Sequence, residues 1–297
     1  MSSDLVATVR RFNRTVTQRV GALDDQYMSR DRPLAQARLL WEIGPDGAEV
    51  AALRARLGLD SGYLSRLLRT LEADGLVTVG PADRAGDGRV RTAALTEAGR
   101  AEWAELDRRS DEYARSILEP LSEQRRARLV AAMAEVERLL VSSMVVIEPC
   151  PPADPRARAC VRAYAREVGQ RFDEGFDPAL SNPVRDEELL PPAGLFLLAA
   201  LNGEPVGCGA LKLHPGAPAE IKRVWVADSV RGLGIGRRLL DHLERYAAEH
   251  GWAAVRLDTN RNLTEAIAMY RAAGYREIEP YNTERYAHHW FEKPLAP

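Results

Sequence analysis

Apolar residues recur at three- and four-residue spacing through residues 4–141, which is typical of amphipathic helices. After residue 145 the pattern changes to short apolar runs that alternate with helical stretches. Runs of this length predict strands, and their alternation with helices indicates an α/β or α+β domain. The expected helices are residues 4–27, 33–43, 49–57, 96–118, 122–141, 154–172, 234–250 and 264–273, and the expected strands are residues 195–201, 206–213, 221–226 and 255–259.

The change of pattern divides a chain of 297 residues, about twice the usual length of one domain. It falls between residues 142 and 146, where no Gly/Ser-rich linker separates the two halves. We therefore predict two stiffly joined domains, a largely helical one over residues 1–144 and a strand-containing one over residues 145–297.

The composition is that of an ordinary globular chain, with 45% hydrophobic residues and a net charge of −2. The longest apolar stretches are about half a bilayer span and the N-terminus has no apolar signal core, so we expect a cytoplasmic protein without membrane contact. Three cysteines, Cys150, Cys160 and Cys208, show no metal-ligand spacing, which favours a reducing compartment and no bound metal. With so little net charge, any DNA-binding surface must be a local patch.

Residues 50–77 predict two helices joined by a tight turn. Gly58 tolerates the positive φ of a helix end, and Asp60 or Ser61 can cap the second helix. One side of that helix is formed by leucines and the other by hydroxyls and arginines, which suit a helix that enters the major groove. The leucines are Leu64, Leu67, Leu68 and Leu71, and the candidate DNA contacts are Ser61, Ser65, Arg66 and Arg69.

A β-hairpin is predicted next, with strands at residues 76–79 and 90–95. Its glycine-rich tip carries Arg84 and Arg89, and arginines on such a wing can enter the minor groove. Thr96 is a candidate cap for the following helix. A helical bundle with a solvated arginine surface is the alternative for any single arginine, but the ordered set of elements favours DNA binding.

In this order the elements resemble the MarR family of winged-helix transcriptional regulators over about residues 3–143. The resemblance implies a homodimer whose first and last helices, residues 4–27 and 97–143, interlock. It also implies a double-stranded DNA operator, with two recognition helices on a pseudo-palindrome. The tip at residues 84–89 is longer than is usual for the family, so the contact of the wing with DNA is left open.

Residues 220–240 predict a strand, a glycine-rich turn and the start of a helix. Glycines here let backbone N–H groups converge on an anion at the helix N-terminus, and arginines can add charge-assisted contacts. The glycine spacing differs from the dinucleotide fingerprint, and no Gly-Lys pair follows as a P-loop requires. The residues are Gly232, Gly234 and Gly236 with Arg231, Arg237 and Arg238.

Arg231, Gly234 and Gly236 resemble the acetyl-CoA signature of the GNAT family of N-acetyltransferases, and the resemblance covers about residues 145–294. It implies a multidomain protein: an all-α winged helix-turn-helix domain followed by an α+β GNAT fold with a mixed central sheet. Two strands of that sheet would splay apart to hold the pantetheine arm of acetyl-CoA, with no metal. The cofactor-binding residues so implied are Val224, Trp225, Val226, Arg231, Gly232, Leu233, Gly234, Ile235, Gly236, Arg237, Asn262 and Tyr270.

The resemblance further implies direct attack of an amine on the thioester. Tyr270 holds the position of the general acid; a core tyrosine that fills the gap between helix and sheet is the alternative. Glu220 begins the strand where many members place a carboxylate that deprotonates the amine through water; a solvent-facing strand end is the alternative. The backbone N–H of Val226 is the candidate for polarising the carbonyl. Asn262 lies one residue further from the tyrosine than the common spacing. Cys208 is predicted to lie in the core, because this chemistry needs no acyl-enzyme.

The amine-bearing acceptor, a small molecule or a protein lysine, is left open by the sequence. The acidic segment 172–192 could attract a cationic amine or could be a solvated lid. Arg285 and Tyr281 could instead bind the carboxylate of an amino acid.

Three functions fit these motifs. The first is a bifunctional transcriptional regulator and acetyl-CoA-dependent N-acetyltransferase. The second is a regulator whose GNAT domain only senses acetyl-CoA, and the third is an enzyme whose winged helix only dimerises. Tyr270 favours the first over the second, because a sensor needs no proton donor. The exposed face around Ser65 and Arg66 argues against the third.

Overall fold

The computed structural model describes residues 3–19, 32–81, 90–182 and 184–295, and the chain divides into two compact units, Met1–Ala132 and Met133–Pro297. The division falls within α6 (Glu123–Met144), ahead of the domain boundary expected after residue 144. Hydrogen bonds explain the difference. Arg138 donates to the carbonyl oxygen of Gly232 and Ser142 to that of Leu233, both at 2.8 Å, so the end of α6 packs with the second unit.

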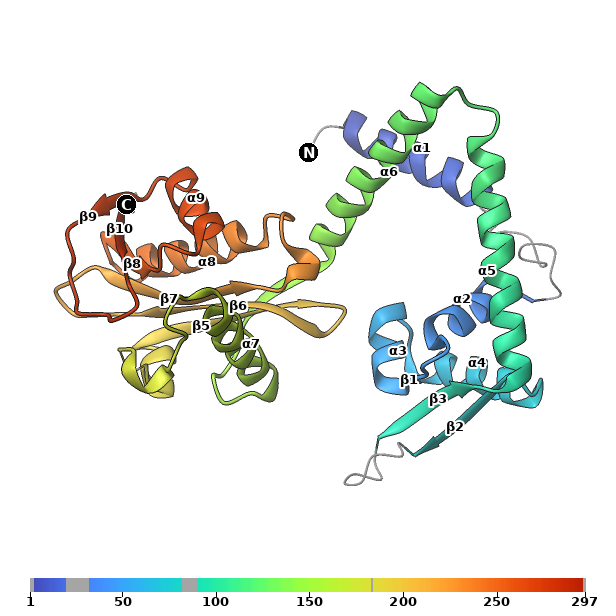
Figure 1. Ribbon diagram of the computed structural model, residues 1–297, viewed down its shortest axis with the longest axis horizontal. Helices are drawn as coiled ribbons and strands as arrows, with labels where there is room; N and C mark the ends of the chain where they lie inside the picture. The colour runs from blue at the N-terminus through green and yellow to red at the C-terminus, as the bar shows by residue number, and fades with distance from the viewer. Residues whose placement is uncertain (1–2, 20–31, 82–89, 183, 296–297) are drawn as a thin grey trace. The chain divides into compact units, whose positions relative to one another are not determined.

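The first unit combines helices with a three-stranded sheet of order β1-β3-β2 (Figure 1). The described part of the predicted first helix ends at Arg19, and its remainder lies outside the described residues. The short β1 was not predicted, because two residues are too few to show a pattern. The elements are α1 (Ser3–Arg19), α2 (Leu34–Ile43), β1 (Ala48–Glu49), α3 (Val50–Leu57), α4 (Ser61–Ala73), β2 (Val77–Pro81), β3 (Arg91–Leu95) and α5 (Glu97–Leu118).

The helix-turn-helix and the hairpin form as the sequence predicts. Gly58 ends α3 in the left-handed conformation, and Asp60 caps α4 by accepting from the backbone N–H of Tyr63 at 2.8 Å. Thr96 caps α5 by accepting from the backbone N–H of Gly99 at 3.0 Å. The four leucines of the predicted stripe on α4 are buried in the core of this unit.

The second unit is built on a seven-stranded sheet of order β4-β5-β6-β7-β8-β10-β9. All neighbouring strands are antiparallel except β7 and β8, which are parallel, so the predicted mixed sheet is confirmed. The elements are β4 (Val145–Pro149), α7 (Pro155–Arg171), η2 (Pro178–Leu180), η3 (Asp186–Leu189), β5 (Gly194–Leu201), β6 (Glu204–Lys212), β7 (Ala219–Val226), η4 (Asp228–Val230), α8 (Ile235–Glu249), β8 (Ala254–Thr259), α9 (Thr264–Ala272), β9 (Arg276–Ile278) and β10 (His289–Pro294).

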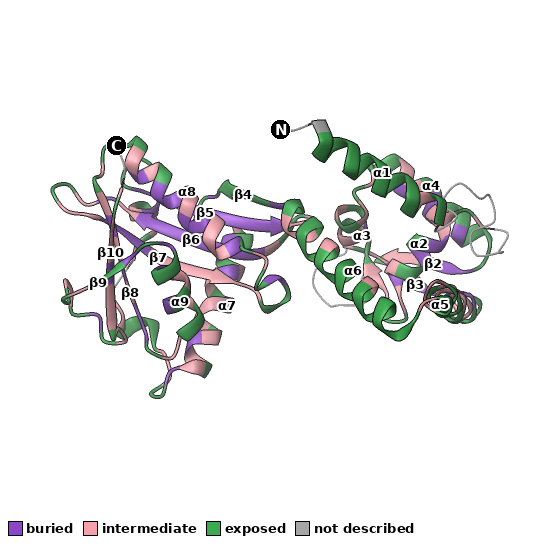
Figure 2. Ribbon diagram, turned by 90° about the horizontal axis from the view of Figure 1, so that it is seen from above, coloured by how far each residue is buried: buried purple, intermediate pink, exposed green. Residues whose placement is uncertain are grey.

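Helices cover both faces of this sheet, which is why its central strands are buried (Figures 1 and 2). Successive side chains of a strand point to opposite faces. Leu195 and Leu197 of β5 accordingly pack in the core that includes α8 and α9, while Phe196 and Leu198 pack in the core that includes α7. Cys208 of β6 lies in this second core, as predicted.

The parallel strands β7 and β8 pair only at their beginnings. Ala219 is opposite Val255 and Glu220 is opposite Arg256, and no further pair joins the two strands. The remainder of β7 therefore diverges from β8, which confirms the predicted splay. This gap in the middle of the sheet positions the site described below.

Within the described residues, no helix has the length and apolar character needed to span a membrane. All three cysteines are free and buried.

Candidate functional site

The turn between β7 and α8 has the backbone of an anion cradle. Gly232 and Gly234 have φ angles of +74° and +76°, which L-residues with side chains rarely adopt. Gly234 is the N-cap of α8, and no side chain from the described part of the chain caps this helix. The amides of its first turn are therefore available to an external anion. A Cβ on Gly236 would lie 2.9 Å from Sδ of Met269, so a larger residue here would displace the end of that side chain.

A cavity of about 480 Å³, here called the turn cavity, lies beside this turn and is bounded by α7, β7 and α9. It collects ten of the twelve predicted cofactor-binding residues from β7, the turn and α9. These are Val224, Trp225, Val226, Arg231, Gly232, Gly234, Ile235, Gly236, Arg237 and Tyr270.

The arginines at the turn are paired within the protein. Arg231 donates from Nε to the carbonyl oxygen of Val226 at 3.0 Å and forms ion pairs with Glu167 and Asp228. Arg237 pairs with Asp241 at 2.8 Å. Because these pairs neutralise much of the positive charge, the main-chain amides are the principal candidates for binding an anion at the turn.

Arg238 does not contact the turn cavity, so the expectation that it binds the anion is wrong. Its guanidinium donates to the carbonyl oxygens of Ser142 and Val145, both at 2.8 Å. It therefore joins α8 to the end of α6 and the start of β4.

Tyr270 on α9 lines both the turn cavity and a second cavity on its other side. Its ring packs against Tyr275 and Phe291, with centroids 5.9 and 6.0 Å away, and the residue is only 6% exposed. Within the described part of the chain, its hydroxyl forms no hydrogen bond. Burial raises the pKa of this phenol above its ordinary value, so it remains protonated at neutral pH.

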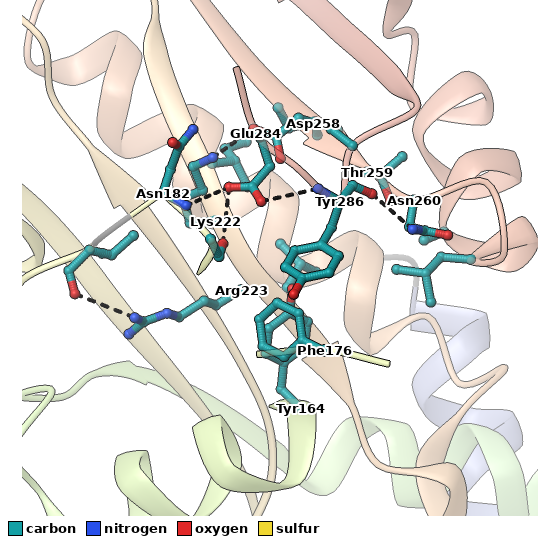
Figure 3. A pocket seen from close by; sticks show the side chains of 18 of the residues that line it. Tyr164, Phe176, Asn182, Lys222, Arg223, Asp258, Thr259, Asn260, Glu284 and Tyr286 are labelled. Carbon is teal, nitrogen blue, oxygen red and sulfur yellow. Dashed lines mark hydrogen bonds and ion pairs between the residues drawn. The ribbon is translucent and has the colours of Figure 1, made fainter. Parts of the chain in front are cut away.

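The second cavity, of about 370 Å³, is here called the aromatic cavity (Figure 3). Four rings on its wall form one cluster, in which neighbouring centroids are 5.1–6.3 Å apart. Charged side chains from β7, β8 and the loop before β10 complete the wall. The rings are Tyr164, Phe172, Phe176 and Tyr286, and the charged residues are Lys222, Arg223, Asp258 and Glu284.

Glu220, the predicted general base, lines neither cavity. Its carboxylate lies 3.0 Å from Nζ of Lys222 and 3.2 Å from Nε2 of His214, and it accepts from the Tyr281 hydroxyl at 3.1 Å. Burial alone would raise the pKa of Glu220, but these partners outweigh burial and hold it below the ordinary value. Glu220 is joined to the wall of the aromatic cavity through Lys222, which also pairs with Asp258 at 2.6 Å, and its role as a base that acts through water stays a prediction.

In the first unit, the predicted DNA contacts lie on the side of α4 away from its leucines. Ser61, Arg66 and Arg69 are exposed and Ser65 is half-buried. Among the described residues, neither arginine pairs with a carboxylate; Arg66 stacks on the ring of Tyr63, and Arg69 donates to the carbonyl oxygen of Ser65 at 3.2 Å. Arg84 and Arg89 lie outside the described residues.

Comparisons with known proteins agree with this division. The sequence model of the acetyltransferase (GNAT) family matches residues 161–275. An uncharacterized N-acetyltransferase of Schizosaccharomyces pombe is 34% identical over 126 residues, which cover 41% of this chain and 75% of the relative. The chain belongs to the GNAT family of acetyltransferases. An IAA acetyltransferase of Azospirillum brasilense is 39% identical over 106 residues, which cover 35% of this chain and 69% of that relative.

A solved GNAT family acetyltransferase from Elizabethkingia anophelis, with acetyl-CoA bound, is 20% identical and matches with a TM-score of 0.36. The match covers 51% of this chain and 99% of that one. The sequence model of the MarR family matches residues 30–89. The protein is thus a fusion of a MarR-family winged helix with a GNAT N-acetyltransferase domain.

Two predicted cofactor residues lie outside the walls of the turn cavity of this GNAT domain, namely Leu233 and Asn262. Leu233 accepts from Ser142 through its carbonyl oxygen. Asn262 donates from Nδ2 to the carbonyl oxygen of Arg171 at 2.7 Å and to Oδ1 of Asp173 at 3.0 Å. Its side chain holds the loop before α9 against the end of α7, and the structure does not bring it to the cavity.

The segment 172–192 lines the aromatic cavity of the GNAT domain with rings and neutral side chains rather than with carboxylates. Arg285 is exposed and pairs with Glu174 at 3.4 Å, and Tyr281 donates to Glu220, so neither lines the cavity. Four of the six carboxylates of the segment are paired elsewhere: Asp173 with Arg261, Glu174 with Arg285, Asp186 with Arg158, and Glu188 with Lys212.

Sequence reasoning missed the charged wall of the aromatic cavity. A signal was present in β7 and β8, where Lys222, Arg223 and Asp258 interrupt strands that are otherwise mostly apolar; charged residues are rarely buried unless paired or functional. Glu284 gave no such signal. Glu284 lies in a loop, and its buried carboxylate has neutral hydrogen-bond donors. It accepts from the Asn182 backbone N–H at 2.7 Å and from the Ser181 hydroxyl at 3.0 Å.

Proposed function

We propose that this protein is a bifunctional cytoplasmic regulator: an acetyl-CoA-dependent N-acetyltransferase joined to a MarR-type domain that binds an operator as a homodimer. The observation that carries the enzymatic half is the position of Tyr270. It lies between a cavity at the glycine turn and a second cavity whose size suits a small molecule.

In this proposal the turn amides at Gly232–Gly236 hold the pyrophosphate of acetyl-CoA, and the gap between β7 and β8 receives the pantetheine arm. Val224 and Val226 bind that arm through their backbones, and the Val226 N–H polarises the thioester carbonyl. Acetyl-CoA supplies an activated acetyl group. These residues fit it, because no side chain from the described part of the chain caps the first amides of α8 and because Gly232 and Gly234 hold the turn in left-handed backbone.

The acceptor amine attacks the carbonyl carbon from the aromatic cavity, a C–N bond forms and the C–S bond breaks. The thiolate takes its proton from the Tyr270 hydroxyl, and the proton of the amine passes to a carboxylate of the cavity wall. Asp258 and Glu284 are the two carboxylates in that wall. The contacts of Asp258 with Lys222, Tyr281 and Asn282 all involve Oδ2, so none of them occupies Oδ1, the oxygen proposed to take the proton.

The alternative is a regulator whose GNAT domain only senses acetyl-CoA. The unpartnered, protonated hydroxyl of Tyr270 favours the enzyme, because a sensor requires no proton donor at this place. Thiol release from acetyl-CoA, measured with purified protein over amino acids, polyamines, aryl amines and lysine peptides, separates the two. Turnover on any amine supports the enzyme. Calorimetric binding of acetyl-CoA without turnover supports the sensor and overturns the enzyme.

For the DNA-binding half, Arg66→Ala is expected to weaken operator binding about ten- to a hundredfold, because a bidentate base contact contributes about 1–3 kcal/mol. The operator is first selected from random duplexes by the purified protein, and binding is then measured by fluorescence anisotropy. Arg115→Ala is the matched control, since Arg115 is an exposed arginine of α5 that pairs with Asp111. Equal affinity of the Arg66 variant and the native protein would exclude this residue from the interface.

For the homodimer, Phe12→Glu is expected to produce a monomer at micromolar concentration. Leu5, Val9, Phe12 and Val16 form one face of α1 and are 41–60% exposed, and an exposed apolar face of this kind marks an interaction surface. Arg14→Glu, on the opposite side of α1, is the control. Sedimentation velocity measures both variants. A Phe12 variant that remains dimeric would show that α1 is not in the interface.

A further inference from the structure

Arg223 lies at an irregularity in β7. Cys208 of β6 is opposite Trp225 and Ala210 is opposite Lys222, so a bulge of β7 falls between these two pairs. Arg223 has a φ of +54°, which is uncommon for a residue with a side chain. Side chains of a regular strand alternate between faces, yet Lys222, Arg223 and Val224 all line the aromatic cavity. The bulge therefore directs the Arg223 side chain into this cavity.

The guanidinium of Arg223 has few hydrogen-bond partners within the described residues. Its one hydrogen bond within the described residues is to the carbonyl oxygen of Val184, at 3.4 Å, and no described carboxylate forms an ion pair with it. Burial lowers the pKa of this group below its ordinary value. Asp186 acts on this guanidinium from beyond ion-pair distance. A half-buried cation without a directly paired carboxylate is unfavourable, so such a group can bind an anionic ligand.

The other charged side chains of this wall are already satisfied. Lys222 is paired with Asp258 at 2.6 Å and with Glu220 at 3.0 Å. Glu284 accepts from Ser181 and Asn182. Figure 3 shows Arg223 in the same wall as these groups, with the rings of Tyr164, Phe176 and Tyr286 also facing the cavity.

We propose that the acceptor is an amine that also carries a carboxylate, and that Arg223 binds this carboxylate in the aromatic cavity. The proposal rests on the acetyltransferase function proposed above and names its substrate class. The planar guanidinium matches a carboxylate with two parallel hydrogen bonds. The ring cluster beside it suits an apolar or aromatic substituent. An α-amino acid with an apolar or aromatic side chain has all three groups: the amine, the carboxylate and the substituent that fits the rings.

The test compares matched acceptors that differ only in the carboxylate. L-Phenylalanine and L-leucine are assayed beside their amides and their decarboxylated amines, with thiol release as the readout. For the native protein, kcat/KM is expected to be about ten- to a hundredfold higher for the acids, as for loss of a charge-assisted hydrogen bond. Arg223→Met is expected to lower kcat/KM for the acids by a similar factor. It is expected to leave kcat/KM for the amides and the KM for acetyl-CoA unchanged.

Two further variants control this comparison. Arg223→Lys keeps the charge but loses the planar fork, so it is expected to restore part of the preference for acids. Arg285→Met removes an exposed arginine that pairs with Glu174 and lies outside the cavity. It is expected to leave kcat/KM unchanged for both the acids and the amides. Thermal unfolding of each variant shows whether the fold survives.

The outcomes separate this proposal from the proposed acetyltransferase function. If kcat/KM is equal for amides and acids, or if Arg223→Met lowers both values alike, the carboxylate site is overturned while the proposed acetyltransferase function stands. If no amine is acetylated, calorimetry with N-acetyl-L-phenylalanine and its amide tests the site without catalysis. Preferential binding of the acid that is lost in Arg223→Met then supports the site, although the enzymatic function fails. Equal binding overturns both.

Discussion

Replacing Tyr270 with phenylalanine is expected to lower kcat by about a hundred- to ten-thousandfold, the usual contribution of a positioned general acid. The substitution removes only the hydroxyl, because the ring packs against Tyr275 and Phe291 and a phenyl group keeps those contacts. The affinity for acetyl-CoA is therefore expected to stay nearly constant. Single-turnover thiol release measures the chemical step, and calorimetry measures the affinity.

Tyr275→Phe is the matched control for this experiment. It also removes one phenol hydroxyl from a buried ring, but that hydroxyl donates to Glu244 at 3.0 Å and Tyr275 lines neither cavity. Its kcat is expected to equal that of the native protein. Because burial raises the pKa of Tyr270, the effect of its substitution is expected to be the same from pH 7 to pH 9. An unchanged kcat in the Tyr270 variant would remove this residue from the chemistry.

Most of the fold could be predicted because its signals are local. The leucine stripe of α4, the caps Asp60 and Thr96 and the left-handed Gly58 each depend on a few neighbouring residues. The glycine turn at Gly232–Gly236 is equally local, so ten of the twelve predicted cofactor residues meet at one cavity. Its contacts with distant parts of the chain are with α6, with Glu167 of α7 through Arg231, and with Met269 of α9 beside Gly236.

The aromatic cavity, which we propose as the acceptor site, could not be predicted, because distant segments build it. Tyr164 comes from α7, Phe176 from the loop after it, and Glu284 and Tyr286 from the loop before β10. A bulge then turns Arg223 toward them, and period-two alternation cannot anticipate a bulge. The surroundings of Glu220 could not be predicted for the same reason, since only the tertiary structure brings its partners Lys222 and Tyr281 to it.

The boundary between the units also depends on long-range contacts. The residues that bind the end of α6 to the glycine turn, Arg138 and Ser142, look like ordinary surface residues of a helix. Their acceptors are the carbonyl oxygens of Gly232 and Leu233, whose amides and neighbours form the anion cradle. α6 therefore holds the turn through its carbonyl oxygens, and the amides of the first turn of α8 have no side-chain cap from the described residues.

Gly234→Val is expected to weaken acetyl-CoA binding about a hundredfold or more, as for the loss of one or two charged hydrogen bonds of about 1.5–3 kcal/mol each. Gly234 has a φ of +76°, and a β-branched residue strains that conformation. The backbone must rotate to relieve the strain, which turns the first amides of α8 away from the pyrophosphate. Calorimetric titration with acetyl-CoA measures the loss.

Gly216→Val separates this effect from a general loss of stability. Gly216 has nearly the same φ, +78°, with open space around its Cβ position, but it lies in the loop between β6 and β7 and lines neither cavity. Both variants are expected to lower the free energy of unfolding by about 1–2 kcal/mol, because both force a side chain into left-handed backbone. Only Gly234→Val is expected to lose acetyl-CoA. If both variants bind acetyl-CoA as the native protein does, the glycine turn is not the pyrophosphate site; if both lose it equally, instability rather than the turn accounts for the loss.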